Sequence, residues 1–142
     1  MAISFHFQEV QKPAFFKALT LRTWLKSIAK KEGFLLQDVN YIFVEEEALL
    51  EINIKYLQHD TYTDIITFDN SDTKGKIESD IYISIERVEA NAQKYNITFE
   101  NELLRVLAHG LLHLCGYKDK SKKEAAEMRQ KEEECLMLWA NR

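Results

Sequence analysis

The spacing of apolar residues changes along this chain, and that change limits the folds open to it. Four short segments indicate strands, by a period of two as in 3–7 or by β-branched and aromatic residues as in 39–44: 3–7, 39–44, 63–68 and 80–85. Five longer segments repeat apolar residues at helical spacing: 13–33, 45–56, 86–95, 98–115 and 121–139. Because the strands lie early and three helices follow them, we expect an α+β fold. Its small mixed β-sheet of about four strands would pack with about five helices.

Residues with strong positional preferences mark the ends of several segments. Pro13 suits the first turn of a helix, and Thr98 is a candidate N-cap for the fourth helix. Ser121 and Glu124 match the Ser-x-x-Glu capping box that begins many helices. The polar segment 69–79 indicates a hairpin-like loop or a mobile flap between the third and fourth strands.

The composition predicts one domain over residues 1–142. With 4 Gly, 1 Pro and 46% hydrophobic residues, the chain is neither collagen-like nor disordered, and 2 Cys are too few for a disulfide framework. The sequence has no secretory leader pattern and no run of 18 apolar residues, so we expect a cytoplasmic protein without membrane partners. The formal net charge of −4 argues against indiscriminate coating of nucleic acid but is compatible with a local basic patch.

Two histidines in the fourth helical segment carry the most chemical information. His109 and His113 are four residues apart, which places their side chains about 40° apart around a helix and one turn apart along it. Gly116 tolerates the left-handed backbone that a reversal requires, and Asp119 lies just beyond it with a carboxylate oxygen. The pattern indicates a metal site with two nitrogens, one oxygen and an open position for water. The same spacing also fits two semi-buried histidines with backbone or solvent partners, so the spacing leaves both interpretations open.

The residue that follows the first histidine excludes one class of enzyme. Metalloproteases of the His-Glu-x-x-His type use a glutamate at that position as general base, and here the position is Gly110. Hydrolysis of a phosphodiester by metal-activated water remains open, because it depends mainly on the metal and on charge stabilisation at phosphate.

The segment from His109 to Asp119 resembles the His-Gly-x-Leu-His-Leu-x-Gly-Tyr-Asp-His signature of the YbeY family. Asn53 followed by Thr63-Asp64-Ile65-Ile66-Thr67-Phe68 resembles that family's Asn and Thr-Asp-Val-Leu-Ser-Phe motif. A third segment, Ser79-Asp80-Ile81-Tyr82-Ile83-Ser84, resembles its Gly-Asp-Ile-x-Ile-Ser motif. Three ordered motifs spread over most of the chain make chance similarity improbable.

The resemblance implies a fold, an activity and a ligand set. It implies a metal-dependent endoribonuclease with a zincin-like metal site at a helix end, holding one Zn. Its implied partners are single-stranded rRNA and the small ribosomal subunit, in maturation of the 16S rRNA 3′ end and in ribosome quality control. Carried over residue by residue, the metal ligands are His109, His113 and Asp119.

Two positions depart from the family pattern. Asp119 stands where the family has a third histidine, and an anionic ligand leaves less positive charge to acidify bound water. Leu57 stands where the family presents a loop arginine, and we take His59 or Lys55 as candidates for its contribution.

A local basic patch lies beside the proposed site. From Tyr117 to Lys131, basic residues exceed acidic ones by three, in a chain that is acidic overall. The candidate contacts to nucleic acid are Lys118, Lys120, Lys122, Lys123 and His59. For any single lysine, an ordinary solvated helix face is the better explanation of the charge. Tyr117 is a candidate for stacking on an unpaired base, and Cys115 is expected to be a packed thiol.

Two other functions fit the residues. A metal-dependent hydrolase of an amide or ester would use water activated by the metal alone, without cleaving RNA. A non-catalytic ribosome-associated binding module would use the metal only to fix the final loop to the helix.

Overall fold

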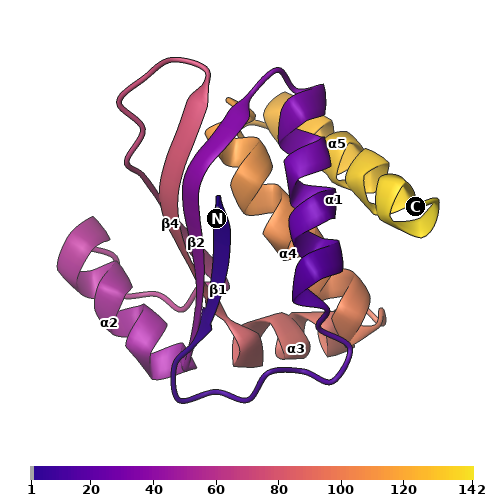
Figure 1. Cartoon of the computed structure of the whole chain (residues 1–142). Helices are drawn as coiled ribbons and strands as arrows, with labels where there is room; N and C mark the ends of the chain where they lie inside the picture. Colours follow the sequence, from indigo (N-terminus) through magenta and orange to yellow (C-terminus); the bar gives the residue numbers. More distant parts are fainter. Residues whose placement is uncertain (1) are drawn as a thin grey trace.

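The computed structural model of the chain describes residues 2–142 (Figure 1). The elements in chain order are β1 (Ile3–Phe7), α1 (Ala18–Lys31), β2 (Leu35–Val44), α2 (Glu46–Leu57), β3 (Ile65–Asp69), β4 (Lys76–Ser84), α3 (Ile85–Lys94), α4 (Phe99–Leu114) and α5 (Lys122–Ala140). The four strands form one sheet in the order β1-β2-β4-β3, in which β1, β2 and β4 are parallel and β3 is antiparallel to β4. The expected α+β fold with a mixed sheet is confirmed.

The helices cover the sheet unequally. In Figure 1, α1, α4 and α5 lie on one side of the sheet, α2 lies on the other, and α3 crosses below. Successive residues of a strand point to opposite faces, and β2 shows the result. Tyr41 and Phe43 join the main core, while Ile42 and Val44 pack with Leu49 of α2 in a second, smaller cluster.

The helix α4 lies at the centre of the main core. Its fully buried side chains include Leu103, Leu107, Leu111 and Leu112. Burying one leucine side chain contributes on the order of 2 kcal/mol, so this helix is fixed firmly against the sheet. Rigid placement of α4 also fixes the polar residues on its remaining side.

The first predicted helix begins later than its sequence indicates. A turn in which the Phe16 N–H donates to the Pro13 carbonyl (3.0 Å) comes first, and α1 starts only at Ala18. Phe16 is buried in the core from this turn instead of from a helix.

The hairpin between β3 and β4 is longer than predicted and its loop is shorter. The strand β4 begins at Lys76 instead of residue 80, because Asn70 N–H donates to the Glu78 carbonyl (2.8 Å) and the Ser71 hydroxyl contacts the Glu78 backbone. The strand β3 begins at Ile65 instead of residue 63. No helix within residues 2–142 has both the length and the hydrophobicity to cross a bilayer.

Candidate metal centre

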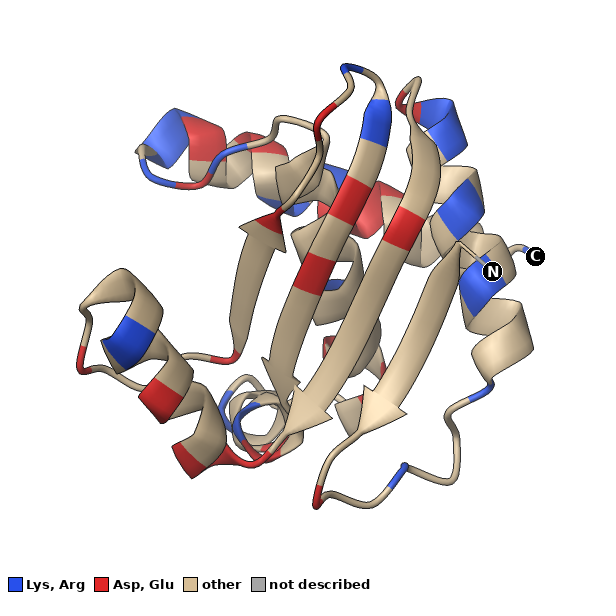
Figure 2. Ribbon diagram, turned by 60° about the vertical axis from the view of Figure 1, so that its left-hand side comes forward, with Lys and Arg blue, Asp and Glu red and all other residues tan. Residues whose placement is uncertain are grey.

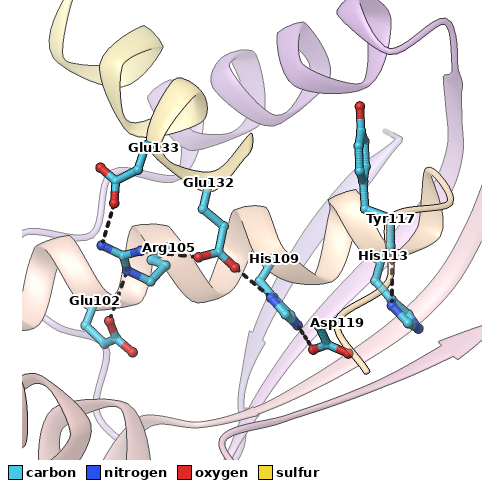
Figure 3. A network of polar contacts seen from close by, with 8 residues as sticks. All are labelled: Glu102, Arg105, His109, His113, Tyr117, Asp119, Glu132 and Glu133. Carbon is cyan, nitrogen blue, oxygen red and sulfur yellow. Dashed lines mark hydrogen bonds and ion pairs between the residues drawn. The ribbon is translucent and has the colours of Figure 1, made fainter. Parts of the chain in front are cut away.

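One side of α4 carries a row of polar side chains. They recur at three- or four-residue spacing: Glu102, Arg105, His109 and His113. Figure 3 shows this row with α5 above it and with Asp119, from the loop between α4 and α5, beside the His109 ring. The row lies opposite the leucines that fix α4 to the sheet, so it faces α5 and solvent.

His109 is held between two carboxylates. Its Nδ1 lies 2.7 Å from Glu132 Oε2, and its Nε2 lies 3.4 Å from Asp119 Oδ2. Burial disfavours the protonated imidazole and by itself would lower the pKa of His109. The hydrogen bond and charge of Glu132, followed by the charge of Asp119, outweigh burial and raise this pKa above its ordinary value. A proton therefore competes with a metal ion for the His109 ring up to a higher pH than it would at an ordinary histidine.

His113 is exposed and is oriented by the turn that follows α4. Its Nδ1 lies 3.2 Å from the carbonyl oxygen of Tyr117. Gly116 has φ of 107°, and the N–H groups of Gly116 and Tyr117 donate to the carbonyls of His113 and Leu112. This is the Schellman arrangement, which reverses the chain and brings Asp119 back beside α4 as the sequence predicted.

The donors fit a metal such as zinc. Both imidazoles have Nδ1 beside an acceptor, which leaves Nε2 available as a ligand, and metal-binding histidines are usually held in this way. Asp119 supplies a carboxylate oxygen on the same side of the helix. Within residues 2–142, no three His, Cys, Asp or Glu side chains stand close enough together to hold an ion as they lie. The structure thus brings His109 and Asp119 together, with His113 one turn away on the same side of α4.

A cleft of about 270 Å³ opens beside His109. Its lining includes Asp64, Asn91, Tyr95, His109, Asp119 and Arg129. Burial is the largest influence on Asp64 and raises the pKa of its carboxyl, while the charge of His109 opposes that rise. The cleft offers space for a substrate next to the Nε2 atom of His109.

Gly110 explains why a glutamate is absent between the two histidines. A Cβ added there would lie 2.9 Å from Ile65 Cδ1 and 3.4 Å from Ile81 Cγ2. This residue faces the sheet, so a glutamate at the same position would enter the core instead of the cleft.

The predicted basic patch is exposed at the start of α5. Lys118, Lys120, Lys122 and Lys123 are all exposed, in the loop that carries Asp119 and in the first turn of α5. Figure 2 shows Lys and Arg positions, interspersed with acidic ones, on the ribbon where α5 begins, and acidic positions along the strands of the sheet. Their place near Asp119 is compatible with the predicted nucleic-acid role.

The structure does not bring His59 to the cleft. His59 is exposed in the loop after α2, and it is not among the cleft-lining residues in the described part of the chain. Buried Asn53 organises this loop, because its Nδ2 donates to the Thr61 carbonyl (2.7 Å) and its own carbonyl accepts from His59 N–H. Leu57 and Lys55 are exposed at the end of α2, where Lys55 lies over the Tyr56 ring.

Packing bears on two further expectations. The Tyr117 hydroxyl donates to Glu32 (2.8 Å) and the Lys131 ammonium lies 5.6 Å from the centre of its ring, so the candidate for base stacking is already held by two side chains. Cys115 packs against the core, and burial raises the pKa of its thiol to about 12. It is a packed thiol, as predicted.

Glu132 and Arg105 were missed by the reasoning from sequence. They meet across the interface of α4 and α5, where Arg105 Nη1 lies 3.2 Å from Glu132 Oε1. A signal was available for Glu132, because Met128, Glu132 and Cys135 share one side of α5 and an acid therefore interrupts an apolar stripe.

Comparison with known proteins gives a consistent match. The family described as Endoribonuclease YbeY matches residues 3–140. A protein of that name from Cytophaga hutchinsonii is 55% identical over 134 residues, 94% of each chain. Another from Parabacteroides distasonis is 41% identical over 97% of this chain and 96% of its own. The solution structure of a protein from Thermotoga maritima is similar with a TM-score of 0.63 and 34% identity, over 98% of this chain and 92% of that chain. The family match extends from β1 to α5 and so spans the part of α4 that carries the row of polar side chains.

Proposed function

This chain belongs to the YbeY family of endoribonucleases, and we propose that it cleaves single-stranded rRNA with the aid of a zinc ion. It is thus a hydrolase that acts on RNA. The proposed task is maturation of the 16S rRNA 3′ end and quality control of ribosomes, on the small ribosomal subunit. Residues 1–142 would form the single domain that carries this activity. Of the functions that the sequence left open, the family assignment favours the nuclease.

His109, His113 and Asp119 are the proposed ligands. The chemistry supplied by bound zinc is Lewis acidity, which polarises a phosphodiester and activates water for attack on phosphorus. The two imidazoles would contribute Nε2, since each Nδ1 already has an acceptor in Glu132 or in the Tyr117 carbonyl. The orientation of the His109 ring, with Nε2 toward Asp119 at 3.4 Å, is the observation that best supports this proposal.

RNA would approach over the start of α5. Lys118, Lys122 and Lys123 attract phosphates in a chain whose formal net charge is −4, so they favour approach beside Asp119. The cleft beside His109 has a volume of about 270 Å³, which is compatible with entry of an unpaired strand.

Cleavage of labelled RNA by matched histidine variants tests this function. We would compare the wild type with His113→Ala and, as control, His6→Ala, an exposed histidine on β1. Each protein is loaded with zinc and assayed on one rRNA fragment, single-stranded or annealed to its complement. We expect cleavage of the single strand, at least a hundredfold loss in His113→Ala, and full activity in His6→Ala.

The opposite result is equally clear. If zinc-loaded wild type leaves the single strand intact, or if His113→Ala cleaves it as fast as the wild type does, the proposed metal-dependent cleavage at this site is wrong.

A further inference from the structure

A buried carboxylate from α5 lies directly behind the candidate ligand His109. Glu132 is only 5% exposed. One of its oxygens lies 2.7 Å from His109 Nδ1, and the other lies 3.2 Å from Arg105 Nη1 (Figure 3). A carboxylate is costly to bury unless both oxygens are satisfied, and here both are.

Salt bridging alone does not account for this placement. Arg105 has two other carboxylate partners, Glu102 at 3.4 Å and Glu133 at 3.3 Å. Glu133 pairs with Arg105 from an exposed position and makes no contact with His109, so the arginine can be neutralised without a buried acid. Of the three carboxylates that pair with Arg105, only Glu132 also gives His109 an anionic acceptor, at Nδ1.

We propose that Glu132 is a positioning residue that sets the tautomer and direction of His109 for metal binding, with Arg105 holding Glu132 in place. This inference rests on the metal site of the proposed function. An acceptor at Nδ1 keeps the proton there and leaves the lone pair of Nε2 facing Asp119. The anionic charge also makes His109 a stronger electron donor than His113, whose Nδ1 faces only a neutral backbone carbonyl.

Glu132→Gln is a sharp test because of Arg105. The guanidinium requires an oxygen, so the glutamine must turn its oxygen to Arg105 and its NH₂ to His109 Nδ1. The NH₂ group can donate a hydrogen bond to Nδ1 only if that atom carries a lone pair. The imidazole proton must therefore move to Nε2, the proposed ligand atom. The matched control is Glu133→Gln, which removes a neighbouring charge from the same arginine.

Two readouts other than activity decide the inference. Long-range ¹H–¹⁵N spectra of the metal-free proteins, at a pH where the imidazole is neutral, report the His109 tautomer. Competition with a chromophoric chelator gives the zinc affinity. We expect the proton on Nδ1 in the wild type and in Glu133→Gln, but on Nε2 in Glu132→Gln. Zinc should bind Glu132→Gln about 10- to 100-fold more weakly than the wild type, with less than a twofold change in Glu133→Gln.

The alternative outcomes separate this inference from the proposed function. Equal zinc affinity and equal tautomers in all three proteins overturn the role of Glu132, even if RNA is cleaved. Weaker zinc binding in Glu132→Gln alone supports that role, even if no protein cleaves RNA. A wild type that binds no zinc contradicts both. If Glu132→Gln does not fold, Arg105→Met combined with Glu102→Leu and Glu132→Leu replaces the buried charges by apolar contact, and its zinc affinity should again be lower than that of the wild type.

Discussion

The two ends of the candidate site are built differently. At the inner end, Arg105 and His109 of α4 contact Glu132 of α5, and Arg105 also pairs with Glu102, in a largely buried network. At the outer end, His113 and Asp119 are exposed. The Tyr117 carbonyl contacts the His113 ring, and a single 3.4 Å contact joins Asp119 to His109. The inner end resembles part of the core, and the outer end resembles a binding surface.

This difference indicates how the site divides its tasks. Buried charge pairs fix one imidazole before any ligand arrives, whereas the exposed end stays open to RNA and solvent. Substitutions at the inner end should therefore change folding stability first, and substitutions at the outer end should change function with little effect on stability.

The largest expected effect comes from the buried side of α4 between the two histidines. Gly110→Glu would force a carboxylate against Ile65 and Ile81 of the sheet, with an expected loss on the order of 4 kcal/mol in the free energy of unfolding. Gly110→Ala is the matched control. Its Cβ comes too close only to the terminal methyl group of Ile65 (2.9 Å) and makes ordinary contacts with Ile81, and alanine favours a helix by about 1 kcal/mol, so stability should change little. Urea unfolding measures both variants. A stable Gly110→Glu protein would show that this residue does not face the core.

Arg105→Ala should give the next largest effect. It leaves Glu102 and Glu132 buried without their cation, and removing one partner of a buried pair costs about 3 kcal/mol. Arg129→Ala removes an exposed arginine of the same cleft and should cost less than about 0.5 kcal/mol. If both variants lose the same free energy of unfolding, the proposed difference in stability between the inner and outer ends is wrong.

Asp64 should show a smaller, pH-dependent effect. Because burial raises the pKa of Asp64 in the folded protein, the unfolded chain releases this proton at lower pH, so the wild type loses stability as pH rises from about 3.8 through the raised value. Asp64→Asn has no proton to release. Its melting temperature relative to the wild type should therefore climb across that window and level off above it, in metal-free protein.

Asp60→Asn, in the exposed loop after α2, is the control and should follow the wild type at every pH. A constant difference between Asp64→Asn and the wild type would mean that the Asp64 carboxyl is solvated in the folded protein.

The smallest effect on stability is expected at the outer end. Replacing both Lys122 and Lys123 with alanine should leave the free energy of unfolding within about 0.5 kcal/mol of the wild type. RNA affinity should fall several-fold, and the slope of log affinity against log salt should become shallower by about 0.7 per lost phosphate contact. Fluorescence anisotropy over a salt series measures this, with alanines at exposed Lys12 and Lys17 as control. Identical salt slopes in the two double variants would remove the start of α5 from the RNA path.

Sequence reasoning succeeded where the signal is local. The Ser121 capping box, the Thr98 N-cap and the Gly116 turn all occur as predicted, because each depends on residues three or four apart. It failed at Pro13, where a turn that buries Phe16 precedes α1. Propensity alone could not foresee that packing decides the first helical residue.

The inner end of the site could not be predicted from sequence, because its contacts are long-range. Glu132 lies 23 residues from His109 and 27 from Arg105 along the chain, and two acids follow it directly. To single out Glu132 among these three acids, one must know how α5 is rotated about its axis relative to α4, and packing alone fixes that rotation. Tyr117 shows the same limit, since its partner Glu32 lies 85 residues away.

The most direct test of a metal centre on α4 is anomalous diffraction. A crystal grown with zinc would be measured on both sides of the zinc absorption edge. We predict one strong anomalous peak bounded by His109 Nε2, His113 Nε2 and the Asp119 carboxylate. A zinc peak elsewhere, or a crystal saturated with zinc that has no peak at these three residues, would contradict the account.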